Sequence, residues 1–164
     1  MEKIIVVGPS GSGKSTFAKE LFHKTSIPIY HLDNIFWNAN KTHITKKEFD
    51  VKLKNILTKD KWIIDGDYSR TYEERFKESD TIFFLDYPLE LCLTSIESRI
   101  GKKRDDIPFI ESEFEEEFRE WINSWYKNTK PKLISLISKY KNTKKIFIFK
   151  SREEATDYLN NLKD

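Results

Sequence analysis

The feature that most constrains this 164-residue chain is a glycine-rich turn near its start, which lies between two different apolar patterns. Residues 8–15 have the sequence GPSGSGKS and fit the spacing G-x-x-x-x-G-K-[ST] at every defined position. Residues 4–7 are all β-branched and apolar, which is typical of a buried strand. Residues 17–22 carry four apolar side chains at helical spacing. A strand, a tight turn and a helix in this order predict a fold in which α and β elements alternate.

The residue types of the turn indicate phosphate binding. Glycines let the backbone turn tightly and aim successive N–H groups inward, and the helix that follows adds the positive end of its dipole. Lys14 can reach the β and γ phosphates of a nucleoside triphosphate, and the Ser15 hydroxyl can ligate Mg²⁺. We therefore expect ATP and Mg²⁺ as cofactors, with the nucleotide held by Gly8, Pro9, Ser10, Gly11, Ser12, Gly13, Lys14, Ser15 and Thr16. The alternative is a strand-to-helix turn without a ligand.

Composition restricts the partners. The 29 basic and 27 acidic residues leave a net charge of +2, too small to indicate nucleic acid or a membrane by itself. No apolar run approaches the roughly 18 residues that a bilayer needs, and the chain opens into a strand rather than a targeting segment, so we expect a soluble cytoplasmic protein. The single cysteine, Cys92, excludes an intramolecular disulfide and is expected to be buried in a helix. The length favours one domain over residues 1–164.

Apolar runs that end at Gly, Asp or Pro predict five strands, at residues 3–7, 28–31, 62–65, 81–86 and 145–149. Helical patterns follow them at residues 15–24, 45–58, 89–100, 114–125 and 133–140, and a last helix is capped by Ser151. The second helix opens with a capping box formed by Thr45 and Glu48. Continuous apolar strands suit a parallel sheet covered on both faces. The predicted fold class is α/β, a P-loop NTPase three-layer sandwich.

Three predicted strands end in an aspartate, where ligands of parallel sheets collect. Asp65 precedes the flexible Gly66 and is the expected partner of Ser15 in holding Mg²⁺. Asp33 suits the acceptor side, where it could bind a hydroxyl or accept its proton. Asp86 is expected to form a structural turn, and any one of the three could be only a turn former or a helix cap.

Arginine is rare in a chain that uses lysine for most of its positive charge: only six of the 29 basic residues are Arg. Guanidinium groups bind phosphate bidentately, and phosphoryl transfer depends on cations around the moving group. Arg70 follows the third strand, and Arg99 and Arg104 flank a charged loop at residues 101–108 that could close over the nucleotide. The alternative for the last two is a solvated helix end. Arg75 and Arg119 are expected in surface ion pairs.

Other side chains give weaker indications. His31 has no second His or Cys at ligand spacing, so a metal role is disfavoured. Phe36, Trp37 and Tyr68 could stack on an acceptor ring or pack against the neighbouring helix. The aromatic stripe at residues 114–125 is expected to belong to the core.

These motifs resemble those of adenylate kinase-like P-loop kinases, and more narrowly those of the DNA topology modulation proteins. The resemblance rests on Gly8 to Thr16, YHLD with Phe36 and Trp37, WIIDG with YSRT at 68–71, FLD with Pro88, and KSR at 150–152. It implies an adenylate kinase-like five-stranded parallel sheet, an acceptor region at about residues 33–60 and a short lid at about 101–108. It also implies phosphate contacts for Arg70 and lid cations at Arg99 and Arg104. Asp67 departs from the family pattern, which has Asn there, and this makes an anionic acceptor less certain.

The preferred interpretation is an ATP-dependent phosphotransferase, in which Lys14, Asp33, Arg70, Arg99 and Arg104 are the catalytic residues. Ser15 and Asp65 hold the metal, and the acceptor is a nucleoside, a nucleotide or another small metabolite. We expect a monomer or a homodimer. The alternative is a nucleotide-switched NTPase or DNA-interacting protein that transfers no phosphoryl group, although the basic residues 139–145 are short enough to be a solvated loop.

Overall fold

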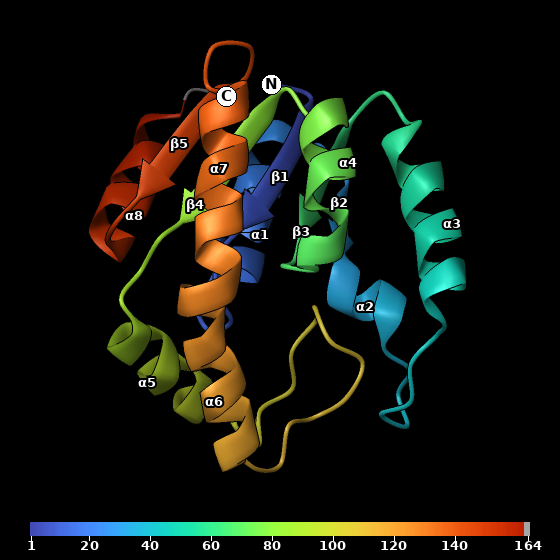
Figure 1. The fold of residues 1–164 in the computed structure, drawn as a ribbon, viewed down its shortest axis with the longest axis vertical. Helices are drawn as coiled ribbons and strands as arrows, with labels where there is room; N and C mark the ends of the chain where they lie inside the picture. Colours follow the sequence, from blue (N-terminus) through green and yellow to red (C-terminus); the bar gives the residue numbers. More distant parts are fainter. Residues whose placement is uncertain (163–164) are drawn as a thin grey trace.

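The computed structural model describes residues 1–162 and builds them around one parallel β-sheet (Figure 1). The strand order is β2-β3-β1-β4-β5, and every neighbouring pair is parallel. The strands are β1 (Lys3–Val7), β2 (Ile29–His31), β3 (Trp62–Asp65), β4 (Thr81–Leu85) and β5 (Lys145–Phe149). The predicted five-stranded α/β sheet is therefore confirmed, with strand ends shifted by at most one residue.

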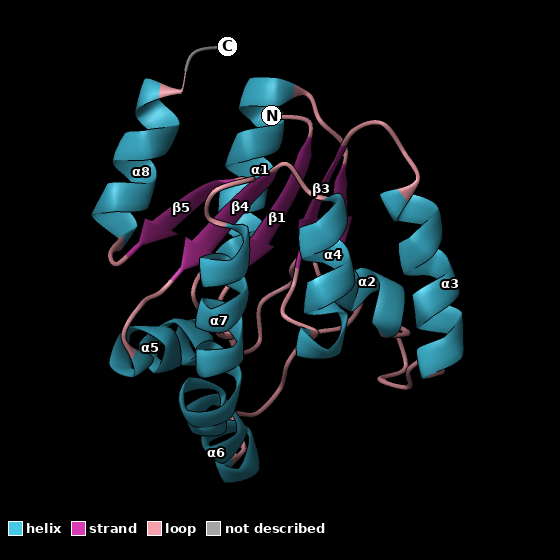
Figure 2. Ribbon diagram, turned by 45° about the horizontal axis from the view of Figure 1, so that its top comes forward, coloured by secondary structure: helices cyan, strands magenta, loops and turns pink. Residues whose placement is uncertain are grey.

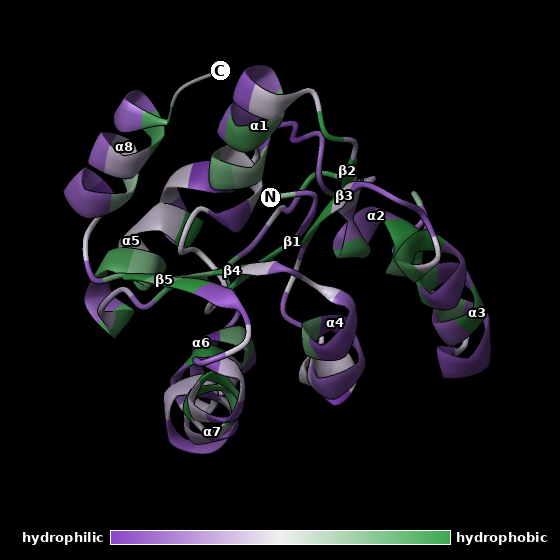
Figure 3. Ribbon diagram, turned by 90° about the horizontal axis from the view of Figure 1, so that it is seen from above, coloured by the Kyte–Doolittle hydropathy of each residue, from purple (hydrophilic) through white to green (hydrophobic). Residues whose placement is uncertain are grey.

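Helices cover both faces of the sheet, so the molecule has three layers (Figures 2 and 3). Helices α1 and α8 lie on one face, and α4 and α7 lie on the other. The bounds are α1 (Lys14–Thr25), α2 (Leu32–Phe36), α3 (Lys46–Leu57), α4 (Tyr72–Glu78), α5 (Leu89–Arg99), α6 (Glu116–Ser124), α7 (Lys130–Tyr140) and α8 (Arg152–Asn161). The expected caps are present: Thr45 and Glu48 form the capping box of α3, and the Ser151 side chain accepts a hydrogen bond from Glu154 N.

The core consists of two main apolar clusters separated by the sheet. Ile5 and Val7 of β1 face one cluster, whereas Ile4 and Val6 face the other. This alternation follows from the two-residue period of a strand, and both sets are fully buried because β1 is the central strand. Cys92 is buried in the second cluster, as expected.

Three elements differ from the sequence-based expectation. Helices α2 and α4 were not predicted, because each is short. The two helices expected on either side of Pro131 are joined into one continuous helical rod by a π-helical turn at Trp125–Thr129. An α-helix would bring the proline ring against the carbonyl of residue 127, and the wider π turn relieves that clash.

The carboxyl ends of the strands all point toward the same edge of the sheet, where α2, α5, α6 and the loop of residues 100–115 lie (Figure 1). Among the described residues, no helix combines the length and the apolar character needed to span a bilayer.

Candidate active site

The glycine-rich loop joins β1 to α1 and has the backbone shape that its sequence predicts. Gly11 has φ +80°, and a Cβ there would lie 2.3 Å from the carbonyl oxygen of Cys92, so only glycine fits. Gly13 has φ +86° but nothing within 4 Å of its Cβ position, so that side of the loop is open. Helix α1 starts without a side-chain cap. The backbone N–H groups of Lys14, Ser15 and Thr16 have no hydrogen-bond partner among residues 1–162, which leaves them available to an anion.

The Lys14 ammonium lies over the same loop. Its Nζ donates to the carbonyl oxygen of Pro9 at 2.8 Å, so the side chain folds back across the turn. Burial lowers the pKa of Lys14, while the charges of Asp67 and Asp65 oppose that shift. A half-buried cation whose main partner is a carbonyl is poised to exchange that partner for a charged oxygen.

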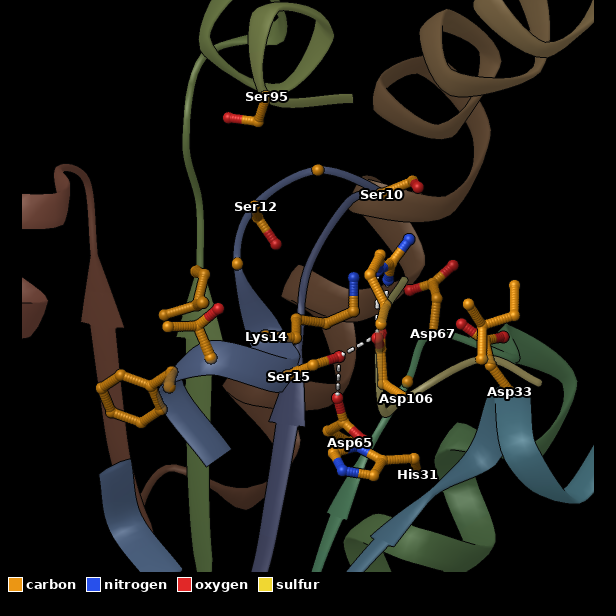
Figure 4. Close-up of a pocket in the computed structure, with 18 of the residues that line it drawn as sticks. Ser10, Ser12, Lys14, Ser15, His31, Asp33, Asp65, Asp67, Ser95 and Asp106 are labelled. Carbon is orange, nitrogen blue, oxygen red and sulfur yellow. Dashed lines mark hydrogen bonds and ion pairs between the residues drawn. The ribbon is translucent and has the colours of Figure 1, made fainter. Parts of the chain in front are cut away.

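Ser15 is the meeting point of two carboxylates from distant parts of the chain (Figure 4). Its Oγ lies 2.7 Å from Asp65 Oδ2 at the end of β3 and 2.7 Å from Asp106 Oδ2 in the loop of residues 100–115. His31 Nδ1 lies 2.6 Å from Asp65 Oδ1 and so orients this carboxylate from the other side. Burial alone would lower the pKa of His31, but its hydrogen bond to Asp65 and the charge of Asp65 outweigh burial and raise it.

The donor set at this point fits a hard divalent cation. One hydroxyl proton cannot satisfy both carboxylate oxygens that face Ser15, and hydroxyl and carboxylate oxygens are the ligands that Mg²⁺ prefers. Within residues 1–162 no group of three or more His, Cys, Asp and Glu side chains could hold a metal ion. A cation here would therefore need further oxygens, such as those of a phosphate.

A cavity of about 1220 Å³ opens along the glycine-rich loop and extends toward α2, α5 and α6. Of the predicted catalytic residues, Lys14, Asp33, Arg99 and Arg104 line this cavity, as does the predicted metal pair of Ser15 and Asp65. These six residues thus come together from four separate segments of the chain.

The loop of residues 100–115 is docked over the cavity by ion pairs. Arg99 binds Glu111 through two nitrogens, at 2.8 and 3.0 Å. Arg104 donates to Glu111 at 2.8 Å and also pairs with Asp106. The next residue, Asp105, pairs with Lys19 of α1 at 2.6 Å. Both predicted lid arginines therefore line the cavity, but carboxylates of the loop of residues 100–115 engage both of them.

Two half-buried aspartates lie on the side of the cavity beyond β2 and β3. Asp33 accepts a hydrogen bond from the Tyr68 hydroxyl at 2.7 Å, and Asp67 accepts one from Trp125 Nε1 at 2.9 Å and another from the Tyr72 hydroxyl. Burial raises the pKa of Asp33, and burial likewise raises the pKa of Asp67. Each carboxylate is held by neutral donors.

Arg70 lies elsewhere. Its guanidinium is half-exposed, makes a two-nitrogen ion pair with Asp50 of α3 and does not line the cavity. Its catalytic role stays a prediction.

Arg75 corrects an expectation. The sequence placed it in a surface ion pair, whereas the structure buries it completely. It donates to Thr71 Oγ1 and to the carbonyl oxygen of Gly66, both at 3.0 Å, and to the carbonyl oxygen of Asp67. Arg75 therefore shapes the turn that carries Asp67. Arg119 does form surface ion pairs, with Glu97 and Glu116, as expected.

The aromatic stripe on α6 divides between the core and the cavity. Ile122 and Trp125 are buried, as predicted, but Trp121 is 52% exposed. Phe118 and Trp121 stack at 5.6 Å and line the cavity, so the expectation that the whole stripe is core was wrong.

Sequence reasoning also missed Asp106 and Glu111, because the loop was interpreted by its cations alone. The adjacent run of Arg104, Asp105 and Asp106 was the available signal.

Sequence comparison relates the chain to adenylate kinases, while no protein-family model matches it. It is 29% identical over 117 residues to the adenylate kinase of Pseudothermotoga lettingae, which covers 67% of this chain and 52% of the relative. It is 32% identical over 116 residues to that of Fervidobacterium nodosum, which covers 66% and 51%. The chain therefore spans about half the length of these curated relatives.

Solved kinase structures share the fold over almost the whole chain. The shikimate kinase of Acinetobacter baumannii in complex with shikimate superposes with a TM-score of 0.63 at 19% identity, covering 99% of this chain and 96% of that one. A sugar kinase from a Janibacter species gives 0.57 at 15% identity, covering 96% and 89%. The chain thus has the α/β fold of the P-loop kinases and is similar in sequence to adenylate kinases.

Proposed function

We propose that the chain is an ATP-dependent phosphotransferase that moves the γ-phosphoryl group to a hydroxyl of a small acceptor. The observation that carries the proposal is the open glycine-rich loop. The N–H groups of its helix end, which have no partner among residues 1–162, lie beside the half-buried ammonium of Lys14 and open into a cavity with carboxylates on the far side. A nest of N–H groups at a helix start binds polyphosphate.

The loop would hold the donor. The N–H groups of Lys14, Ser15 and Thr16 would contact phosphate oxygens, and Lys14 would exchange the Pro9 carbonyl for the β and γ phosphates. Ser15 and Asp65 would hold Mg²⁺, which when bound neutralises charge on the phosphates. His31 keeps the Asp65 carboxylate turned toward Ser15.

Asp33 would receive the acceptor. Tyr68 donates to Oδ1 of Asp33, which leaves Oδ2 for the acceptor hydroxyl. The hydroxyl proton passes to Asp33 as the acceptor oxygen forms a bond to the γ phosphorus. The bond from the γ phosphorus to the bridging oxygen breaks, and ADP leaves with that electron pair.

The surrounding segments complete the proposal. The region of about residues 33–60 would bind the acceptor, and the loop around residues 101–108 would act as the lid. Arg99 and Arg104 would exchange their carboxylates for oxygens of the moving phosphoryl group. Arg70 would act only if its ion pair with Asp50 opened.

The test is phosphoryl transfer from γ-labelled ATP to a panel of nucleosides, nucleotides and small alcohols, with Mg²⁺ present. We expect a new phosphorylated product with the wild-type chain. Asp33→Asn should lower kcat at least about 100-fold, because general acid–base catalysis contributes about 10²–10⁴-fold. Arg119→Ala is the surface control and should act like wild type. Hydrolysis of ATP without a phosphorylated acceptor would contradict transfer.

The narrower resemblance to DNA topology modulation proteins leaves a nucleotide-switched protein as the second candidate. Within the basic residues 139–145, however, Lys139 pairs with Glu73, and Lys144 donates to the carbonyl oxygens of Lys77 and Ser79. Two of the four lysines in this segment therefore have partners on the surface of the same chain. A salt-dependent gel shift by the ATP-bound chain, without transfer, would favour the second candidate.

A further inference from the structure

We propose that the acceptor is an alcohol without a phosphate group, neutral or positively charged, with a flat or apolar body. This inference rests on the proposed function and narrows its substrate class. It follows from the charges and walls of the cavity beyond Ser15, on the side of α2 and of the turn after β3.

Carboxylates dominate this half of the cavity. Asp33, Asp65 and Asp67 all line it, and in Figure 4 Asp67 and Asp33 lie to the right of Lys14 while Asp65 lies below it. Asp33 and Asp67 accept hydrogen bonds from neutral groups only, namely Tyr68 in the first case and Trp125 and Tyr72 in the second. Among the described residues, neither makes an ion pair within 4.0 Å. Lys14 partly offsets their charges, and the remainder acts on whatever enters the cavity.

No arginine of the same half is available to hold an acceptor phosphate. Arg70 pairs with Asp50 outside the cavity. Arg75 is fully buried beneath the turn, where carbonyl oxygens and the Thr71 hydroxyl take up its N–H groups. Lys14 belongs to the donor loop. Arg70 and Arg75, the two arginines near the turn after β3, thus already have partners within the chain.

The loop of residues 100–115, which lies over the cavity, adds no net positive charge to it. Residues 101–113 contain three cations and four carboxylates. Arg104 is paired with Asp106 and Glu111, and Arg99 at the end of α5 is paired with Glu111. Lys103 borders the cavity and the Lys41 ammonium lies over the Phe109 ring at 5.7 Å, but both side chains are exposed, so solvent and salt screen their charges. Once Arg99 and Arg104 turn to the donor, little positive charge remains for the acceptor.

The walls of this half are aromatic. Phe36 and Tyr68 meet at 5.5 Å, and Trp37 meets Phe109 of the overlying loop at 5.8 Å, all four lining the cavity. Stacking of Tyr68 on Phe49 at 5.0 Å holds one wall in place before any ligand binds. Preformed apolar walls with a few convergent polar groups are suited to a ring or an apolar body that carries a hydroxyl.

A phosphomonoester would meet repulsion here. Bringing two negative charges beside half-buried carboxylates costs free energy, because like charges repel and partial burial weakens the screening by water. An alcohol can donate to Asp33, and a protonated amine is attracted to Asp67. The site thus discriminates by repulsion as well as by fit.

The experiment uses the full chain, Mg²⁺-ATP and two matched pairs of acceptors, adenosine with AMP and pyridoxal with pyridoxal phosphate. We measure the Kd of each member with an unreactive ATP analogue bound, because the phosphorylated member no longer carries the free hydroxyl of its partner. We also measure kcat/KM for any member that is phosphorylated. We expect the member without phosphate to be preferred at least tenfold. Asp67→Asn should reduce that preference by improving the phosphorylated member, whereas Asp60→Asn, an exposed control, should not.

Preference for the phosphorylated member in either pair would overturn the inference, as would equal discrimination by wild type and Asp67→Asn. The inference would also be overturned if none of the four compounds bound, because the aromatic walls would then not accept a ring. Those outcomes leave the proposed function standing if the chain still binds Mg²⁺-ATP. Failure to bind Mg²⁺-ATP would instead remove the proposed function itself.

Discussion

Single buried charges fix the conformation of turns at the carboxyl edge of the sheet. Arg75 illustrates this: it lies beneath the turn after β3 and donates to the carbonyl oxygens of Gly66 and Asp67. Burial lowers the pKa of Arg75, and the charges of its neighbours oppose that shift. The turn and the guanidinium therefore depend on each other.

Replacing Arg75 with Met should destabilise the chain by about 3 kcal/mol or more, since removing one partner of a buried charged network leaves the other groups unsatisfied. Urea unfolding monitored by circular dichroism measures this. Arg119→Met, which removes an exposed ion pair, should change the free energy of unfolding by less than about 1 kcal/mol. Equal effects of the two substitutions would contradict the structural role of Arg75.

Asp80 gives a prediction about pH. It accepts hydrogen bonds from Glu2 N at 2.8 Å, Lys3 N at 2.9 Å and Thr81 Oγ1 at 2.6 Å. Burial alone would raise the pKa of Asp80, but these hydrogen bonds outweigh burial and lower it below the ordinary value of 3.8. A carboxyl whose folded-state pKa is lowered contributes stability above its unfolded pKa and loses it as pH falls through the folded one.

Wild type should therefore lose more unfolding free energy than Asp80→Asn between about pH 5 and pH 2.5, because the amide does not titrate. Urea midpoints at several pH values measure this. Parallel loss in both proteins would show that Asp80 does not contribute to acid sensitivity.

Short sequence motifs predicted those single residues whose role depends on their neighbours in the sequence. The loop residues from Gly8 to Thr16 follow from one motif, and Asp33 and Asp65 follow from their places at strand ends. Asp106 and the pairing of Arg70 with Asp50 could not be predicted, because both depend on how distant segments dock.

Among the elements, the helices with clear start signals formed where the sequence predicted them. The Thr45 side chain accepts from Glu48 N at 3.2 Å, and the Glu48 carboxylate accepts from Thr45 N at 2.7 Å. This box fixes the first turn of α3, which packs Phe49 and Leu53 into the core.

Thr45→Ala should lower the free energy of unfolding by about 1 kcal/mol, because it leaves helix-start N–H groups without a partner. Thermal or urea unfolding measures the loss. The Thr58 hydroxyl, at the other end of the same helix, donates only to the carbonyl oxygen of Asn55, so Thr58→Ala should cost less. A larger loss at Thr58 would contradict the capping account.

Shorter or distorted elements were less predictable. Helix α4 has only seven residues, Tyr72–Glu78, too few to establish a helical period. The π turn before Pro131 depends on tertiary packing: it places Trp125 in the core, where Nε1 reaches Asp67. Sequence periodicity predicted two separate helices, each with one apolar face, but it did not predict that the π turn joins them into one continuous rod.

For the whole molecule, the strand order places the glycine-rich loop at the centre of the edge. β1 lies between β3 and β4, so the loop has the end of β3, with Asp65, on one side and the end of β4 on the other. Ligands of open parallel sheets bind at such points, where connections diverge to the two faces. The five parallel strands were predictable from five apolar runs, whereas the docking of residues 100–115 over the loop was not.

The central claim is that this loop binds a triphosphate, and calorimetric titration of the chain with Mg²⁺ and an unreactive ATP analogue tests it most directly. We predict that the wild type binds the analogue at one site. Lys14→Ala should weaken the affinity about tenfold or more, because a charge-assisted hydrogen bond contributes about 1.5–3 kcal/mol. Lys132→Ala, on the exposed face of α7, should leave the affinity unchanged. Equal affinity of wild type and Lys14→Ala, or no binding by wild type, would contradict the account.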